Sequence, residues 1–127
     1  MHILLIEPDS LLARTYVQAL LSAGHTVDHA RSGQSAVILA DEHMPDVVVL
    51  EMQLPTQNGI AFLQEFRSYP DWQAIPVLLH TYIAPQGNET ICDIVTREYG
   101  VIGWLYKPQT SLAQLVSILH RHAVGEL

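Results

Sequence analysis

Residues 45–59 of this 127-residue chain read Pro45-Asp-Val-Val-Val-Leu-Glu51-Met-Gln-Leu-Pro55-Thr-Gln-Asn-Gly59. The aliphatic run Val47–Leu50 carries no polar residue, which is typical of a central parallel strand covered on both faces. An acidic residue, Glu51, follows the run at once. In sheets of this kind, ligands bind beyond the carboxyl ends of the strands. The stretch therefore predicts a buried strand with a carboxylate at a binding edge.

Short aliphatic or β-branched runs alternate with segments of helical spacing on either side of this stretch. The expected strands are His2–Ile6, Thr26–Ala30, Val47–Leu50, Ile75–Thr81 and Ile102–Leu105. The expected helices are Ser10–Ala23, Gln34–Glu42, Asn58–Ser68, Asn88–Tyr99 and Ser111–Val124. Because crossovers between parallel strands are right-handed, this alternation predicts a doubly wound α/β fold with a five-stranded parallel sheet and five helices. The more polar Thr26–Ala30 run is expected at an edge, and residues 1–127 are expected to form a single domain.

Composition narrows the classes of function. The longest apolar runs have about five residues, whereas a membrane-spanning helix needs about 20. Thirteen acids against six bases give a net charge of −7, which repels a nucleic-acid backbone. The first residues lack the pattern of a secretory signal, and the single cysteine, Cys92, is expected to be a small buried helix residue. We therefore expect a cytoplasmic protein that neither spans a membrane nor binds nucleic acid directly.

Polar side chains follow four of the predicted strands. These segments are Glu7-Pro8-Asp9, Glu51-Met52-Gln53, Thr81-Tyr82 and Tyr106-Lys107-Pro108. Lys107 is the only lysine in the sequence. Because the carboxyl ends of parallel strands lie at one edge of a sheet, these carboxylates, a hydroxyl and an ammonium group are expected to converge. Such a group could hold one small anionic ligand together with a metal ion.

In their order and spacing, four segments resemble the response-regulator receiver family. Ile3–Glu7 is similar to its first strand and acidic turn, and residues 45–59 are similar to its phosphorylation segment. Ile75–Thr81 is similar to the switch strand, and Gly103–Pro108 is similar to the lysine segment. The resemblance covers essentially the whole chain. It implies a flavodoxin-like fold and a part in two-component, phosphorelay signal transduction.

The resemblance also implies roles for individual residues. In the family, acids after the first strand help to bind Mg²⁺, an aspartate after the third strand accepts a phosphoryl group, and a hydroxyl and a lysine contact the phosphate. Thr81 and Lys107 match the hydroxyl and the lysine, and Trp104 matches the aromatic residue of the switch. Glu51 stands at the phosphoacceptor position. Pro108 matches a proline whose preceding peptide bond is usually cis, so a cis bond is expected here.

Two departures from the family pattern fall on the reaction centre. Pro8 stands where a second, metal-binding acid is usual, and proline offers neither a carboxylate nor an N–H. Glu51 is one methylene longer than aspartate, which moves its carboxylate by roughly 1.5 Å, and a 1 Å displacement can cost about a hundredfold in rate. Glu7, Pro8, Asp9 and Gln53 are therefore expected to form a degenerate metal site with weak or absent Mg²⁺ binding. Asp9 is expected to cap the first helix instead.

The permanent charge of Glu51 suggests a substitute for phosphorylation. We hypothesise that Glu51 pairs with Lys107 without a metal, either holding an active-like state or remaining as a relic in a fixed, inactive-like shape. Trp104 is interpreted either as a bulky switch residue that favours a fixed surface or as ordinary packing. Tyr82 is expected to narrow the mouth of the site. His80 is expected to be a core or strand-face residue.

The sequence favours an atypical receiver, or pseudo-receiver, that is not an enzyme and signals through protein contacts or dimerisation. The expected contact face comprises the fourth helix, fifth strand and fifth helix. One alternative is a phosphorelay receiver with weak or non-standard phosphorylation, and another is the regulatory domain of a longer DNA-binding transcription regulator. An enzyme of similar architecture is disfavoured, because the sequence has no Gly-rich phosphate loop and no nucleophile elbow.

Overall fold

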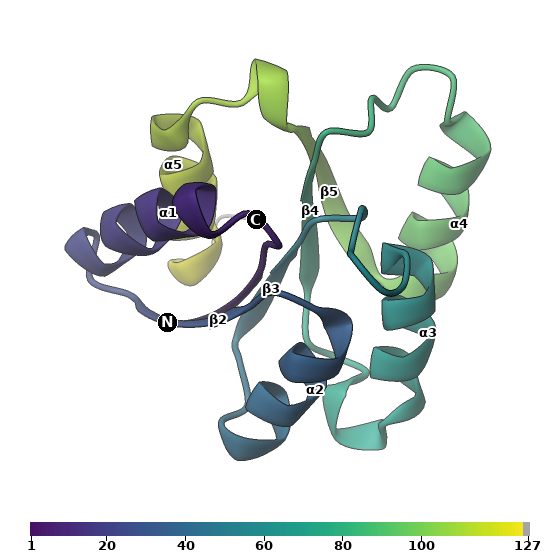
Figure 1. Cartoon of the computed structure of the whole chain (residues 1–127), viewed down its shortest axis with the longest axis horizontal. Coiled ribbons are helices and arrows are strands. Elements are labelled where there is room, and N and C mark those ends of the chain that lie inside the picture. The colour runs from purple at the N-terminus through teal and green to yellow at the C-terminus, as the bar shows by residue number, and fades with distance from the viewer. Residues whose placement is uncertain (126–127) are drawn as a thin grey trace.

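The computed structural model describes residues 1–125, which form a five-stranded parallel sheet with helices on both faces (Figure 1). The strands are β1 (His2–Ile6), β2 (Thr26–Ala30), β3 (Val47–Leu50), β4 (Val77–Thr81) and β5 (Val101–Tyr106). The α-helices are α1 (Ser10–Ser22), α2 (Gly33–Glu42), α3 (Gly59–Ser68), α4 (Glu89–Tyr99) and α5 (Leu112–Ala123). Short 3-10 helices cover Pro70–Trp72 and Lys107–Gln109. The strand order β2-β1-β3-β4-β5 is the doubly wound, flavodoxin-like arrangement that the sequence predicted.

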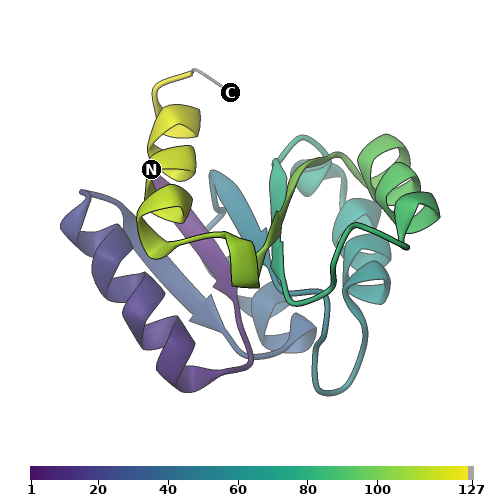
Figure 2. The same cartoon turned by 90° about the horizontal axis from the view of Figure 1, so that it is seen from above.

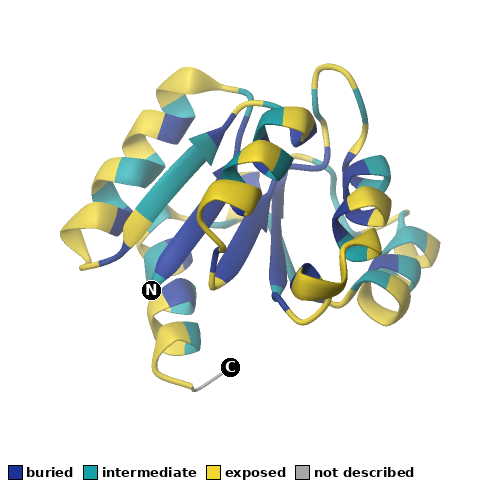
Figure 3. Ribbon diagram, turned by 90° about the horizontal axis from the view of Figure 1, so that it is seen from below, coloured by how far each residue is buried: buried dark blue, intermediate teal, exposed yellow. Residues whose placement is uncertain are grey.

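The helices divide into two layers, with α1 and α5 on one face of the sheet and α2, α3 and α4 on the other (Figures 1 and 2). Because side chains alternate along a strand, successive residues of β3 enter opposite cores. Val48 and Leu50 pack with the large aromatic Phe62 of α3, and Val47 and Val49 pack with residues of α1 and α5. All of β3 is buried, as predicted for a central strand (Figure 3).

Strand β2 lies at the edge of the sheet, as its polar residues predicted. Only its last residue, Ala30, is buried. The strand is held through parallel pairing with β1, in which His2 lies opposite Thr26 and Ile6 lies opposite Ala30. This register sets the positions of the side chains at both ends of the two strands.

Several element boundaries are shifted by one or two residues from the predicted ones, and two of these shifts have local chemical reasons. Strand β4 begins at Val77 rather than at Ile75, because Pro76 has no N–H to donate to a neighbouring strand. Helix α3 begins at Gly59, because Asn58 is its N-cap and uses its side chain to accept a main-chain N–H of the first turn. Capping residues stand just outside the helices that they stabilise.

Helix α4 carries Cys92, which the sequence predicted to be buried. The residue is half-buried, so that prediction is wrong. Val95 is the buried residue of this helix, and Cys92 lies beside that inward stripe. Burial and the nearby Glu89 raise the pKa of the Cys92 thiol, which lowers its thiolate content and its reactivity. Within residues 1–125, no helix is long and apolar enough to cross a membrane.

Candidate functional site

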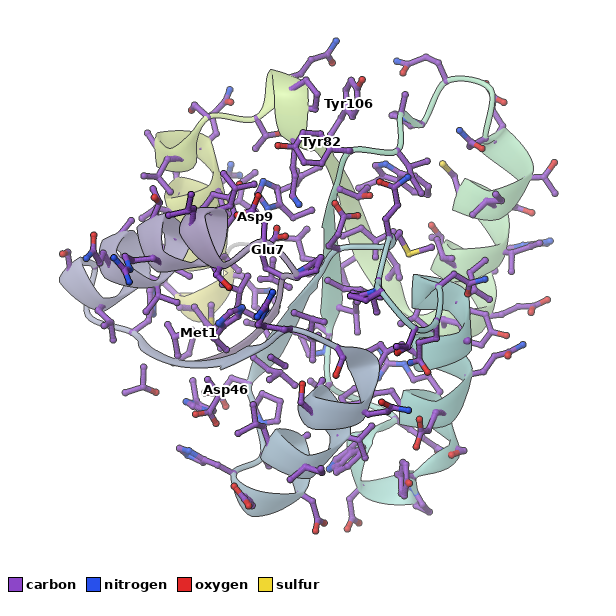
Figure 4. All side chains as sticks on the ribbon, viewed as in Figure 1. Met1, Glu7, Asp9, Asp46, Tyr82 and Tyr106 are labelled. Atoms are coloured by element: carbon purple, nitrogen blue, oxygen red, sulfur yellow. The ribbon has the colours of Figure 1, made fainter. Side chains whose placement is uncertain are left out.

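Four buried polar side chains meet where β1, β3, β4 and β5 end. Glu7, Glu51, Thr81 and Lys107 follow or close these strands, and each is at most 8% exposed. Figure 4 labels Glu7 and Tyr82 at this carboxyl edge of the sheet. Buried charges are costly unless they are paired and hydrogen-bonded, so their partners decide what this site can do.

Lys107 lies between the two glutamates. Its Nζ donates to Glu7 Oε1 at 2.5 Å and to Glu51 Oε1 at 2.8 Å. The three side chains form two ion pairs with nearly no exposed surface. The contact between Glu51 and Lys107 is the one hypothesised from the sequence. The bond from Lys107 to Glu7 was not predicted, because the family pattern gives no reason to pair the two.

Each of the two carboxylate oxygens of Glu51 accepts two hydrogen bonds. Oε2 accepts from the Thr81 hydroxyl and from the Gln53 N–H, the latter at 3.0 Å. Oε1 accepts from Lys107 and, at 3.3 Å, from the Tyr82 N–H. Two of these donors are main-chain groups, which sequence reasoning missed because every residue except proline has the same N–H. The carboxylate is therefore held by a complete set of donors.

The pKa values follow from this arrangement. Burial alone raises the pKa of Glu51, but hydrogen bonds from Lys107, Thr81 and Gln53 outweigh burial and leave it below its usual value. Burial alone lowers the pKa of Lys107, but hydrogen bonds and attraction from Glu51 and Glu7 leave it above its usual value. Both groups are thus charged at neutral pH, and the ion pair is stable there.

Glu7 and Asp9 are engaged in local structure. Glu7 Oε2 accepts the N–H of Asp9 at 3.0 Å. Asp9 caps α1 as predicted, with its side chain accepting the N–H groups of Leu11 and Leu12 at 2.9 and 3.1 Å. Its carboxylate is therefore already committed to the start of the helix.

The residues at this edge do not fit a magnesium ion. Mg²⁺ demands near-octahedral oxygen ligation. The oxygens of Glu7 and Glu51 are occupied by Lys107 and by N–H and O–H donors, and Pro8 provides no carboxylate. The Gln53 N–H donates to Glu51 at 3.0 Å, so this main-chain group takes up another oxygen of the site. The ammonium group of Lys107 instead supplies the positive charge between the two carboxylates.

Thr81 and Trp104 are connected through the main chain of Ile83. The Ile83 N–H donates to Thr81 Oγ1 at 3.2 Å, and Trp104 Nε1–H donates to the Ile83 carbonyl at 2.9 Å. Trp104 is half-buried and packs against the core on the side of α3 and α4. The two residues at the predicted switch positions therefore share one neighbour.

Tyr82 lies over the buried ammonium group. The Lys107 Nζ is 4.7 Å from the centre of the Tyr82 ring, which is within the range of a cation–π contact. The Tyr82 residue itself is 52% exposed, so the ring covers the pair from the solvent side. This position agrees with the expected narrowing of the site mouth.

The prediction of a cis peptide bond before Pro108 is wrong, because residues 1–125 contain no cis peptide bond. Instead, the chain turns through a 3-10 helix, Lys107–Gln109, with proline in its first turn. Proline suits that position because its fixed φ matches the helix and its missing N–H has no partner to lose. Lys107 is the first residue of this turn and directly follows Tyr106 of β5, which pairs with Thr81 of β4.

His80 is a core residue, one of the two environments expected from the sequence, and is only 3% exposed. Its ring meets that of Tyr16 edge-on, with 5.0 Å between the ring centres. Burial, reinforced by the charge of Lys107 and opposed by that of Glu51, lowers the pKa of His80 to about 4. The imidazole is therefore neutral at pH 7 in the folded chain.

Because His80 is buried and neutral, we expect the folded chain to lose stability at acid pH. The pKa of His80 in the folded chain, about 4, lies below the ordinary 6.5, so the unfolded chain takes up the proton first. The contribution of His80 to the free energy of unfolding is therefore fully present above pH 6.5. It is lost as the pH falls toward 4, which lowers the free energy of unfolding by about 3 kcal/mol. In denaturant unfolding, we expect the free energy of unfolding of His80→Phe to lack this decrease at acid pH. The control His120→Phe, at an exposed site, should show the same decrease as the parent chain. A nuclear magnetic resonance titration that shows the His80 ring protonating near 6.5 would contradict this prediction.

Comparisons with known proteins agree with this architecture. The model of the family described as "Response regulator receiver domain" matches residues 3–120. The virulence transcriptional regulatory protein PhoP of Salmonella typhimurium is 25% identical over 126 residues, which cover 97% of this chain and 54% of PhoP. The transcriptional regulatory protein PhoP of Escherichia coli K12 is 30% identical over 81 residues, covering 64% of this chain and 35% of that protein. The chain thus spans about half the length, or less, of these curated relatives.

Solved structures show the same fold. A sensor protein from Polaromonas sp. JS666 superposes with a TM-score of 0.84 at 21% identity, covering 99% of this chain and 98% of that one. The signal receiver domain of a signal transduction histidine kinase from Syntrophus aciditrophicus has a TM-score of 0.82 at 25% identity, with 98% and 90% covered.

Proposed function

Because the chain belongs to the response regulator receiver domain family, whose model matches residues 3–120, we propose that it is an atypical receiver that signals without phosphorylation of Glu51. Receivers of this family are signalling modules that act through other proteins. The observation that carries the proposal is the Glu51 carboxylate, whose two oxygens already accept hydrogen bonds from Lys107, Thr81 and two main-chain N–H groups. A phosphodonor would have to displace these donors before it could reach the carboxylate.

The same contacts favour an active-like arrangement over an inactive relic. A phosphoryl group draws in a hydroxyl and a cation by supplying charge and acceptor oxygens. Glu51 supplies both, although with fewer oxygens, and the Thr81 hydroxyl and the Lys107 ammonium both donate to it. We infer that this internal ion pair takes the place of phosphate and metal together. The chain would then signal in a constant state rather than act as an enzyme.

The proposed output face comprises α4, β5 and α5. Ile102 on β5 is 49% exposed, and a mainly apolar groove beside it is lined by Leu105, Ile118 and Leu119. Such a surface suits a protein partner or a second copy of the chain. The net charge of −7 disfavours direct contact with nucleic acid. A single unpaired cysteine is compatible with the reducing cytoplasm, which we propose as the location.

A second proposal concerns a longer protein. The relatives named PhoP are transcriptional regulators, and this chain matches about half of the Salmonella protein. A chain of this kind could serve as the regulatory part of a DNA-binding transcription regulator. The DNA contacts would then come from a domain other than this receiver, and the account of Glu51 would be unchanged.

Intact-mass measurement separates the leading proposal from a weakly phosphorylated receiver. After incubation with a small acyl-phosphate donor and Mg²⁺, we expect the mass of this chain to stay unchanged, because Glu51 is misplaced and already bonded. A receiver with an aspartate at the acceptor position, treated in the same way, is the positive control. A stoichiometric gain of one phosphoryl group by this chain would overturn the proposal, and fragmentation would identify the modified residue.

A further inference from the structure

We propose that His2, Asp28 and His43 form a binding site for one divalent transition-metal ion, with Zn²⁺ as the expected metal. A possible ligand atom from each residue lies within 4.8 Å of the others. The cluster is at the amino-terminal edge of the sheet, opposite the Glu51 pocket. In Figure 4, Met1 and Asp46 mark the region of this edge, and Glu7 marks the other.

Strand register and a helix end bring the three ligands together. His2 opens β1 and lies opposite Thr26, the first residue of β2. Because side chains alternate along a strand, Asp28 lies on the same face as Thr26. His43 is the C-cap of α2, which covers that face. The three residues therefore come from three elements that only the folded chain juxtaposes.

His2 is already oriented for coordination. It is 8% exposed, and its main-chain N–H donates to Asp46 Oδ2 at 2.6 Å. Its Nδ1 lies 2.7 Å from the Thr26 hydroxyl, and its Nε2 lies 3.0 Å from Asp28 Oδ2. The Thr26 hydroxyl can accept a hydrogen bond from Nδ1–H, and in that tautomer Nε2 carries no proton and can bind a metal in place of its contact with Asp28. A partner on the other ring nitrogen is the usual second contact of a metal-binding histidine.

The donor set selects the class of metal. Two imidazole nitrogens and one carboxylate suit Zn²⁺ and its transition-metal neighbours, whereas Mg²⁺ and Ca²⁺ prefer ligands that are all oxygen. His43 is exposed and Asp28 is partly exposed, so a fourth, tetrahedral position can be filled by water. The net charge of −7 also favours the approach of a cation.

Coordination requires two small local movements. The rings of His2 and His43 are stacked, with 3.8 Å between their centres and 18° between their planes. Nitrogen lone pairs lie in the ring plane, so in nearly parallel rings they do not point at a common atom. His43 is exposed, so its ring can tilt about its side-chain bonds until its nitrogen faces the metal. Asp28 has to move slightly away from His2, because a metal ion between them replaces the direct 3.0 Å contact of Nε2 with Oδ2, and its partial exposure permits this movement.

A bound ion would connect the end of α2 to β1 and to the edge strand β2. Strand β2 is mostly exposed or half-buried, so it depends on few buried contacts. A ligand that binds only the folded chain raises its stability as the ligand concentration rises above Kd. The site would therefore tie down an edge strand that has a single buried residue, independently of the Glu51 pocket.

The test is a titration of the full, tag-free chain with Zn²⁺, followed by isothermal calorimetry and by thermal unfolding. We expect one Zn²⁺ per chain and a rise in Tm that Mg²⁺ does not produce. His43→Ala and Asp28→Asn should each weaken binding by roughly tenfold or more. Both side chains are at least partly exposed, so these variants should fold without metal.

His120→Ala is the matched control, because His120 is an exposed histidine on α5 outside the cluster. It should bind Zn²⁺ as the parent chain does. In nuclear magnetic resonance spectra, the ring signals of His2 and His43 should shift together during the titration. Absence of stoichiometric binding, or equal affinity in the parent chain, His43→Ala and Asp28→Asn, would overturn the proposal.

Discussion

Replacing Lys107 with methionine is expected to lower the free energy of unfolding by about 3 to 5 kcal/mol at pH 7. Methionine retains much of the side-chain volume but removes the ammonium group that donates to both Glu7 and Glu51. Two buried carboxylates would then face each other without a cation between them. Removing one partner of a buried pair is costly because the remaining charge stays desolvated. Denaturant unfolding measures the change directly.

The direction in which the free energy of unfolding changes with pH shows whether the lost ion pairs of Lys107 cause this destabilisation. In the parent chain the pKa of Lys107 is raised, so its stabilisation is present at neutral pH and is lost only as the pH rises through the folded-state pKa. The pKa of Glu51 is lowered, so its stabilisation is present above the ordinary 4.5 and is lost as the pH falls through the folded-state pKa. Without Lys107, the two carboxylates gain by taking up a proton. The stability gap between parent and Lys107→Met should therefore narrow from pH 7 to about pH 5.

Arg97→Met is the matched control for the loss of a cation. Arg97 pairs with Asp93 at 2.8 Å across one turn of α4, but both side chains are more than half exposed. Exposed pairs of this kind contribute about 0.3 to 0.5 kcal/mol, so this variant should be close to the parent in stability. Equal effects of the two substitutions would contradict the account of a buried, tightly coupled site.

Restoring two acids is expected to give the chain the phosphoryl chemistry that we propose it lacks. In the double variant Pro8→Asp/Glu51→Asp, the first change adds a carboxylate beside Glu7, and the second withdraws the acceptor carboxylate by one methylene. Thr81 and Lys107 remain to contact a phosphoryl group. We expect this variant to bind Mg²⁺ and to gain one phosphoryl group from a small acyl-phosphate donor under conditions that leave the parent chain unmodified.

The single variants separate the two departures. Glu51→Asp alone retains Pro8 and lacks the added metal ligand, so it should be modified far more slowly than the double variant. Pro8→Asp alone retains the longer side chain, whose displaced carboxylate can cost about a hundredfold in rate. Intact mass with and without Mg²⁺ gives the comparison. A folded double variant that stays unmodified would show that further residues, such as Tyr82 over the ammonium group, also prevent the reaction.

Much of the fold could be predicted because the spacing of apolar and polar side chains along the sequence differs between strands and helices. The apolar run Val47–Leu50 predicted a central strand, and the polar Thr26–Ala30 predicted an edge strand; both are confirmed. The wrong details depend on main-chain geometry. The peptide bond before Pro108 is trans and lies in a 3-10 turn, whereas the cis bond was expected from the family pattern alone.

The site was predicted only in part for a related reason. Acids and a lysine after parallel strands predicted that Glu51 and Lys107 would meet, and they do. The bond from Lys107 to Glu7 depends on where a flexible side chain comes to rest. The main-chain donors of Gln53 and Tyr82 have no signature in the sequence, since their N–H groups are common to nearly all residues. Such contacts appear only when the backbone path is known.

A cation that belongs to the chain itself behaves differently from one drawn from solution. The ammonium group of Lys107 is tethered beside Glu51, so its effective concentration is set by the fold and does not vary with the supply of free ions. On our proposal, neither metabolic state nor a kinase would then adjust this pocket. The strength of the output would follow the abundance of the protein, so its synthesis and degradation would carry the control that phosphate turnover exerts elsewhere.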